Sequence, residues 1–218
     1  MKNVDKHAAV KRWGTFALLY LGYMLLFADR TVMNISLAYI GKDFHVGAAA
    51  LGTTASAFFL GYTLMQIPGG YLTDRFGSKR LIIISLLAWS LLTMVTGWAW
   101  SLVALIAIRF LFGVAEGPYP AAALKRISEN YDKSEKSQAT SALISSNYAG
   151  AAVAPLLIVP IIASAGWRNA FVWLGVIGLV VMVTYYLVER PIKQAPTRGG
   201  QRPKMGGRNI DSRVWVFV

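Results

Sequence analysis

Six long apolar segments, separated by short polar stretches, run through most of the 218-residue chain. Each is long enough to cross a bilayer, which takes about 20 mostly apolar residues in a helix. Their hydrophobicity is continuous rather than alternating, which argues against the strands of a membrane β-barrel. The predicted spans lie near 14–37, 50–72, 81–100, 102–124, 138–164 and 168–188. The pattern predicts an all-α integral membrane protein whose six-helix bundle covers residues 14–189.

The basic residues predict the orientation of this bundle. Only Lys42 and Arg168 lie on one side, whereas all other loops and both flanking segments on the opposite side are rich in Lys and Arg. The positive-inside rule then puts both ends of the bundle in the cytoplasm, which requires an even number of spans. We therefore expect a multi-pass protein of the inner (plasma) membrane.

Three segments outside the spans complete the expected organisation. Residues 1–13 are polar and basic and form a predicted cytoplasmic tail. Residues 190–213 are rich in Pro, Gly and base and form a predicted flexible cytoplasmic linker. The apolar run VWVFV at 214–218 is the predicted start of a seventh helix. The chain is thus expected to be the first half of a longer protein, with a C-terminal six-helix half as its partner.

Composition supports the membrane assignment. Hydrophobic residues make up 56% of the chain and charged residues 15%, against roughly 45–50% and about 25% in soluble domains. The net charge of +12 is spread over the loops, which argues against nucleic acid as a partner. The absence of cysteine excludes disulfides and thiolate metal sites, and we expect neither a metal nor a cofactor.

Catalytic chemistry has little support. No paired acid and base, metal-ligand cluster or phosphate-binding loop is evident, and the two histidines, His7 and His45, lie in the tail and in an outer loop. The Gly-rich stretch TRGGQRPKMGG lacks both a preceding strand and the Lys-Ser/Thr of a P-loop. The sequence therefore predicts that the protein is not an enzyme.

Four charged residues fall inside predicted spans: Asp29, Arg30, Arg109 and Glu116. The eight Leu, Ile, Phe and Val residues of 14–34 contribute roughly −2.4 to −4.8 kcal/mol to insertion, against about +5 to +7 kcal/mol for the Asp29–Arg30 pair. These charges must therefore face protein or water, and ionisable residues so placed are candidates for function. Asp29 could alternatively lie near the membrane surface, where the cost is smaller.

Arg109 and Glu116 are seven residues apart, so they share one helix face at a separation of roughly 10 Å along the axis. Gly113 and Gly117 allow another helix to approach that face closely. A face with both charges should line a cavity. The alternative is that the four charges form buried ion pairs that only hold helices together.

Further polar residues are candidates for the same cavity. Tyr62 and Gln66 are one turn apart in the second span, and Asn147 and Tyr148 are neighbours in the fifth. Each could instead make an interhelical hydrogen bond that involves no substrate.

The loop GGYLTDRFGSKR at 69–80 resembles the cytoplasmic signature between helices 2 and 3 of the major facilitator superfamily. The matching gating-motif residues are Gly70, Asp74, Arg75, Gly77 and Arg80, together with Leu72 and Lys79. Gly70 is expected to permit close helix packing and Gly77 a tight turn, while Asp74 caps a helix or pairs with a neighbouring base. Ser78 stands where a base is common.

Two stretches narrow the resemblance. DRTVMNIS in the first span and RFLFGVAEGPYPAA at 109–122 are similar to the anion:cation symporter family, and GWRNAF at 166–171 and ERP at 189–191 also fit. The family implies twelve helices in two six-helix bundles, with substrate bound between them by alternating access.

The resemblance also implies residue roles. Arg30 would bind a substrate carboxylate, with Tyr62 and Asn147 in contact with substrate; Asp29 and Glu116 would carry protons. Arg109 would pair with Glu116, and it is a further substrate-binding candidate. Phe27 stands where tyrosine is usual, so one hydrogen bond to substrate is missing.

The residues themselves suggest the coupling. An anion that competes for an arginine removes the counter-charge of a buried carboxylate, which then takes a proton more readily. The expected function is therefore proton-coupled uptake of a small organic anion, a sugar acid or other carboxylate. Exchange of organic anions or phosphate, which paired Arg30 and Arg109 would favour, stays open, as does a truncated half that does not transport. The fifth span keeps Gly150 and Pro155 of the antiporter pattern but has Ala154 before the proline and lacks the glycine pair that follows it, which favours uptake over export.

Overall fold

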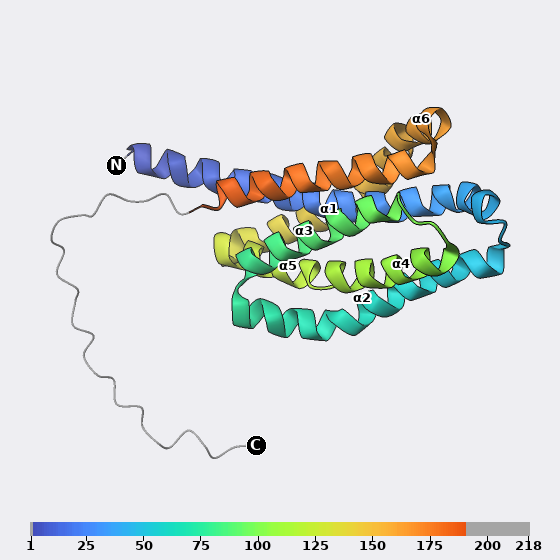
Figure 1. Cartoon of the computed structure of the whole chain (residues 1–218). Coiled ribbons are helices and arrows are strands. Elements are labelled where there is room, and N and C mark those ends of the chain that lie inside the picture. Colours follow the sequence, from blue (N-terminus) through green and yellow to red (C-terminus); the bar gives the residue numbers. More distant parts are fainter. Residues whose placement is uncertain (1, 191–218) are drawn as a thin grey trace, which may run out of the picture.

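The computed structural model describes residues 2–190, and within that range all regular secondary structure is helical. Figure 1 shows the helices side by side in an elongated bundle. The elements are α1 (Lys2–Phe44), α2 (Ala48–Phe76), α3 (Ser78–Thr96), α4 (Leu102–Glu116), α5 (Tyr119–Asn130) and α6 (Lys133–Val188). The all-α membrane fold predicted from the sequence is confirmed.

These helices make the six predicted passes. α4 and α5 together form one apolar stretch, Leu102–Asn130, which is interrupted at Gly117 and Pro118. The long α6 contains two passes, because the chain reverses at Gly166, whose φ of 82° and ψ of 161° are not helical. A positive φ costs glycine little, so this residue allows the sharp reversal.

The helix ends differ from the predicted spans. α1 begins at Lys2 and ends at Phe44, whereas the predicted span covers 14–37. Hydrophobicity reports the part of a helix that lies in lipid, but backbone hydrogen bonding continues beyond it into polar sequence. Residues 2–13, predicted as a tail, are therefore a helical extension of α1. The predicted linker from residue 191 onward and the start of a seventh helix lie outside the described residues.

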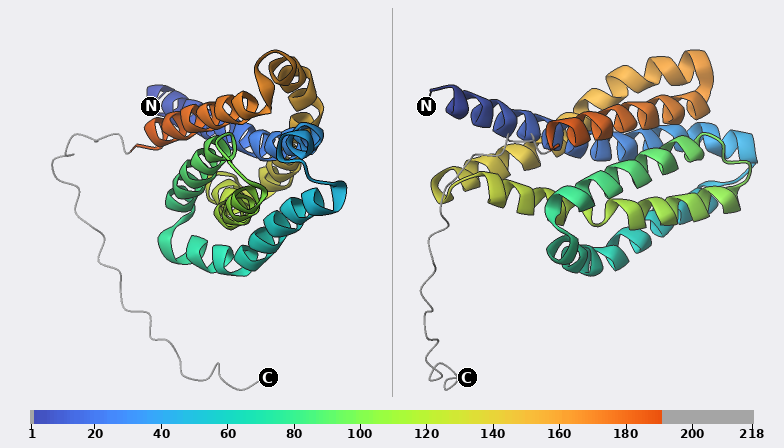
Figure 2. Two further views of the ribbon diagram at one scale, coloured as in Figure 1. Left: turned by 45° about the vertical axis from the view of Figure 1, so that its right-hand side comes forward. Right: turned by 60° about the vertical axis from the view of Figure 1, so that its left-hand side comes forward.

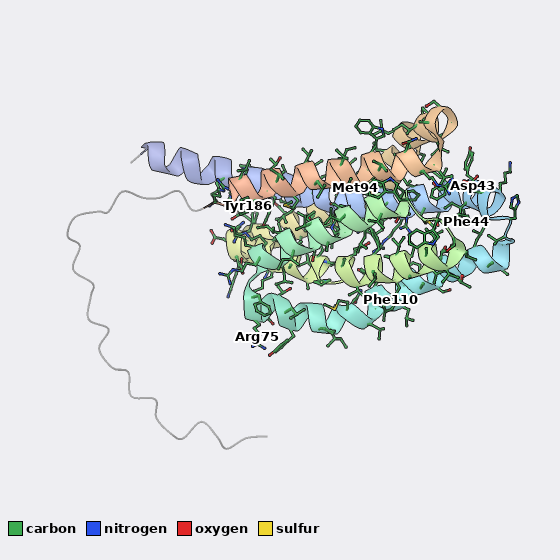
Figure 3. The ribbon with its side chains drawn as sticks, in the orientation of Figure 1. Asp43, Phe44, Arg75, Met94, Phe110 and Tyr186 are labelled. Atoms are coloured by element: carbon green, nitrogen blue, oxygen red, sulfur yellow. The ribbon has the colours of Figure 1, made fainter. Side chains whose placement is uncertain are left out.

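Both ends of the described chain lie at the same end of the bundle (Figures 1 and 2). Figure 3 shows Arg75 and Tyr186 near that end, with Asp43 and Phe44 at the opposite one. At the opposite end, Asp43 accepts hydrogen bonds from Trp167 Nε1 (2.9 Å) and from Arg168, which ties α1 to the reversal in α6. We call the end where residues 2 and 190 lie the inner end and the other the outer end.

Glycines let several helix backbones touch. A Cβ on Gly61 of α2 would overlap the carbonyl of Phe110 in α4, and one on Gly113 would overlap the carbonyl of Phe58. Gly150 of α6 lies in the same way against the backbone of Met24 in α1. The structure therefore presses α2 against α4, and α1 against α6, with no side chain between them.

Two apolar cores fill the bundle, one toward each end. On α1 the boundary between them falls between Leu26 and Ala28, and on α4 it falls between Ile108 and Phe112. Asp29 and Arg109 lie at this boundary. The charged residues thus sit near the middle of the bundle.

Candidate functional site

Asp29 of α1 and Arg109 of α4 form a buried ion pair. Arg109 Nη1 donates to Asp29 Oδ1 at 2.7 Å, and the two side chains are 3% and 0% exposed. Thr93 of α3 donates a second hydrogen bond to Asp29 Oδ2 at 3.0 Å. Three helices therefore contribute to the site, and Asp29 is buried among them.

Arg30 and Glu116 form the second pair. Arg30 Nη2 donates to Glu116 Oε1, and Glu116 is fully buried while 23% of the Arg30 side chain remains exposed. The Arg30 guanidinium carbon lies 4.7 Å from the ring centroid of Phe27 and 5.0 Å from those of Phe58 and Tyr62. Aromatic rings within about 6 Å attract a cation, so they hold the guanidinium in place.

This pairing differs from the expected one. The resemblance implied a contact between Arg109 and Glu116, but Arg109 pairs with Asp29 and Glu116 pairs with Arg30. Two turns of helix separate Arg109 and Glu116, so α1 can insert one partner for each of them. The prediction that all four charges face the interior is confirmed.

The backbone around Glu116 is also unusual. α4 ends at Glu116, and α5 begins at Tyr119. Pro118 and Pro120 each lack the N–H that would continue the helical hydrogen bonds of α4. Gly117 and Pro118 nevertheless keep helical φ and ψ, so the stretch Leu102–Asn130 continues past Glu116 as one span that lacks some of its backbone hydrogen bonds.

A cavity of about 80 Å³ lies beside both arginines. It is lined by Arg30, Met33, Asn34, Thr54, Ala55, Phe58, Phe59 and Arg109. Arg109 lines this cavity as predicted, but Glu116, which was predicted to line it together with Arg109, does not. Such a site offers cationic hydrogen-bond donors to an anion and carboxylates that can accept protons.

The other polar candidates are less closely assembled. Tyr62 joins the site through its contact with Arg30. Asn147 is half-buried on α6, and its Oδ1 has no hydrogen-bond partner among the described residues. Gln66 and Tyr148 are exposed, and neither lines the cavity beside the arginines.

The gating motif lies near the inner end. Gly77 has a φ of 87° and makes the predicted tight turn between α2 and α3. Asp74 accepts a hydrogen bond from Lys125 of α5 at 2.7 Å, which is the expected pairing with a neighbouring base. The expected packing role of Gly70 is wrong, because a Cβ there would meet nothing; Gly69 instead lies against Pro118.

A second polar cluster at the inner end was not predicted. Glu189, just after α6, accepts hydrogen bonds from Thr15 of α1 (2.7 Å) and Arg126 of α5 (2.5 Å). Burial alone would raise the pKa of the Glu189 carboxyl, but these hydrogen bonds and the Arg126 charge together lower it below its ordinary value. The only sequence pattern that had drawn attention to Glu189 was the ERP triplet at 189–191.

Two residues of the central site were also missed. Phe58 stacks on Tyr62 with ring centroids 5.8 Å apart, and Thr93 bonds Asp29. Phe58 occupies the helix position one turn before Tyr62, so helical spacing could have found it. Thr93 had no comparable signal, because its partner lies 64 residues away.

Comparison with known proteins decides the family. The profile described as Major Facilitator Superfamily matches residues 19–217. The chain belongs to the major facilitator superfamily. A solved bacterial homolog of the human lysosomal transporter Spinster, in its inward-facing unoccupied conformation, superposes with a TM-score of 0.76 at 25% identity. That match covers 88% of this chain and 46% of the other.

Curated relatives of this superfamily member are transporters. A probable sulfoacetate transporter of Cupriavidus necator is 30% identical over 90% of this chain and 46% of its own length. A probable galactarate/D-glucarate transporter of Escherichia coli K12 is 30% identical over 83% and 42%. The hexuronate transporter of Bacillus subtilis is 28% identical over 82% and 43%. The chain spans less than half the length of these relatives, and sugar acids recur in their names, as the family resemblance implied.

Proposed function

We propose that this protein is the N-terminal bundle of a secondary active transporter that takes up a small organic anion together with protons. The observation that carries the proposal is the pair of buried arginine–carboxylate contacts, Arg109–Asp29 and Arg30–Glu116, beside one cavity. The similarity to transporters of sugar acids supports a sugar acid or other carboxylate as substrate.

Arg30 is the proposed primary binding residue for the substrate carboxylate. It is the more exposed of the two arginines, and its Nε has no partner among the described residues. A carboxylate that binds Arg30 would compete with Glu116 for the same cation. Glu116, once deprived of its counter-charge in a buried site, would take up a proton.

Asp29 is the proposed second proton carrier. Asp29 is a buried carboxylate that pairs with Arg109, just as Glu116 is a buried carboxylate that pairs with Arg30. Tyr62 and Asn147 are proposed to contact the substrate, and the loop with Gly70, Asp74, Arg75, Gly77 and Arg80 to gate the inner side. Alternating access would expose the site to each side in turn, with the inner end in the cytoplasm.

The proposal is tested with the natural full-length gene product in membrane vesicles. We expect an inward proton gradient to drive accumulation of galactonate, galactarate or glucuronate. The Glu116→Gln variant keeps an oxygen that can accept from Arg30 but cannot take a proton, so it should lose the stimulation by the gradient. The surface carboxylate Glu135 provides the control, and Glu135→Gln should retain full stimulation.

A Glu116→Gln variant whose uptake still follows the proton gradient would refute the coupling role of Glu116. For Arg30, replacement by Ala should raise the KM for the anion by at least about tenfold, since a charged hydrogen bond is worth about 1.5–3 kcal/mol. An unchanged KM would refute the binding role of Arg30.

Exchange of organic anions or phosphate is a second candidate, because both arginines line one cavity. An exchanger would need an anion on the far side of the membrane but no proton gradient. Vesicles preloaded with phosphate or with unlabelled substrate, at equal pH on both sides, therefore distinguish the two functions.

A further inference from the structure

Half of the residues that line the cavity beside the arginines are apolar. They are Met33 of α1 and Ala55, Phe58 and Phe59 of α2, and we call these four side chains the apolar wall. The three residues of α2 occupy positions i, i+3 and i+4, so they share one face of that helix. The rings of Phe58 and Phe59 meet edge to face with their centroids 4.9 Å apart. The cavity therefore has a continuous hydrocarbon surface on its α2 side.

Aromatic carbon also surrounds the residue proposed to hold the carboxylate. The Arg30 guanidinium carbon lies 4.7 Å from the ring centroid of Phe27 and 5.0 Å from that of Phe58. Phe27 stands where the family resemblance implied a tyrosine, so this position adds no hydroxyl. The body of an anion bound to Arg30 would thus lie beside rings rather than beside hydrogen-bonding groups.

Few polar groups of the lining are free to bond a hydroxylated ligand. Thr54 is fully buried, and its hydroxyl already donates to the Leu51 carbonyl at 2.6 Å. Only 3% of the Arg109 side chain is exposed. Asn34 is exposed and lines the cavity. Apart from Arg30, this lining therefore offers a single amide to the hydroxyls of a substrate.

Such surroundings distinguish between two kinds of organic acid. A hydroxyl that moves from water against hydrocarbon without a hydrogen-bond partner costs free energy. A ring or chain carbon that makes the same move is stabilised. A sugar acid carries several hydroxyls, and the part of the site built by this bundle cannot satisfy them all.

We propose that the apolar wall determines substrate specificity, so that the preferred substrate is a compact carboxylate with an apolar body rather than a polyhydroxylated acid. Arg30 binds the carboxylate, and Met33, Phe58 and Phe59 contact the body. This inference rests on the proposed function, because it assigns the substrate class of the same site. The class differs from the sugar acids in the names of the hexuronate and galactarate/D-glucarate transporters.

The test compares two carboxylates of matched shape. The ring form of D-glucuronate and cyclohexanecarboxylate each carry a carboxylate on a six-membered ring, but only glucuronate has hydroxyls. Titration calorimetry with the purified natural full-length protein gives Kd for each acid, free of the passive diffusion of an apolar acid through lipid. We expect cyclohexanecarboxylate to bind about 10- to 100-fold more tightly. Arg30→Ala should weaken the binding of both acids, because both use the same carboxylate contact.

Variants of α2 locate the source of this preference. Phe59→Leu keeps the wall apolar and should retain the ratio of the two Kd values. Phe59→Asn supplies an amide to the hydroxyls and should lower the ratio several-fold, and the smaller change Ala55→Ser should lower it in the same direction. Leu60→Asn is the control, since Leu60 is as exposed as Phe59 but lies outside this cavity, and the ratio should not change.

Three results would overturn the inference. Equal Kd values, or tighter binding of glucuronate, would remove the apolar preference, and the proposed function would stand if a proton gradient still drives glucuronate into vesicles. A preference for cyclohexanecarboxylate that persists at full affinity in Arg30→Ala would place the binding outside this site. If neither acid shows protein-dependent, proton-driven uptake, the inference and the proposed function fall together.

Discussion

The adjacent residues Asp29 and Arg30 serve two different ion pairs. Successive side chains on a helix point about 100° apart, so neighbours in sequence cannot share one partner easily. Asp29 reaches Arg109, and Arg30 reaches Glu116. Each of these charges is thereby paired with a residue from another helix, so none of the four faces lipid without a partner.

Thr93 allows the strength of this arrangement to be measured. Thr93→Val removes the hydrogen bond to Asp29 and should lower the free energy of unfolding by about 1–3 kcal/mol, because a buried charged acceptor loses a partner. Thr96→Val is the control, since Thr96 is equally buried and bonds only the Leu92 carbonyl. Thermal unfolding in detergent gives the comparison, and equal shifts for both variants would contradict the prediction.

At the residue scale, the sequence predicted which charges turn inward but not which of them pair. The inward orientation follows from the cost of a charge in lipid, which depends only on local hydrophobicity. The partner of Arg109 depends on how α1 and α4 are rotated against each other. That rotation arises from contacts between residues far apart in sequence, such as Gly61 with Phe110.

At the element scale, α2 and α4 lie in direct backbone contact. Gly61 and Gly113 are the two residues that make this possible, and Phe58 of α2 stands next to the contact. The same ring lies 5.0 Å from the Arg30 guanidinium. The spacing between α2 and α4 therefore affects where Phe58 lies, and through Phe58 it affects the position of Arg30 on α1.

Gly61→Ala should force α2 and α4 apart. We expect a loss of about 1–3 kcal/mol of stability, as for other overpacked interiors, and a higher KM for the anion because Phe58 moves. Gly52→Ala on the same helix is the control, since a Cβ there meets nothing and alanine favours the helix by up to about 1 kcal/mol. A Gly61→Ala protein as stable as the parent would show that the contact can relax.

Hydrophobic patterning located every span but not the missing hydrogen bonds between α4 and α5. The predicted helix 102–124 continues through Glu116, and in the structure Gly117 and Pro118 keep helical φ and ψ although the regular hydrogen bonding of α4 ends at Glu116. The GPYP sequence contained the signal, since each proline lacks a donor. Its consequence depends on the surroundings, because neighbouring groups can satisfy the backbone carbonyls that a proline leaves free.

At the scale of the whole molecule, basic side chains gather at the inner end, near both ends of the described chain. The sequence has no cysteine, so a single introduced thiol can report its own exposure. Lys42→Cys at the outer end should react with a membrane-impermeant maleimide in intact cells. Lys133→Cys at the inner end should react only after permeabilisation, and the reverse pattern would contradict the proposed orientation.

The Glu189 cluster joins α1, α5 and the end of α6 and gives the bundle a pH-dependent element. Because its pKa is lowered in the folded state, Glu189 contributes stability above the ordinary value of 4.5, and that contribution is lost as the pH falls through the lowered pKa. The Tm difference between the parent and Glu189→Gln should thus be largest near neutral pH and shrink below pH 4.5. Glu135→Gln, at a surface ion pair, should show little difference at any pH.

The two central ion pairs also bear on the electrical behaviour of the membrane. With both carboxylates ionised, the four charges sum to zero, and moving one uncompensated charge across 100 mV would cost or release about 2.3 kcal/mol. Under the proposed alternating access, an empty bundle therefore changes sides without work against the membrane potential. Voltage then acts only on the charge that the substrate and its protons carry together.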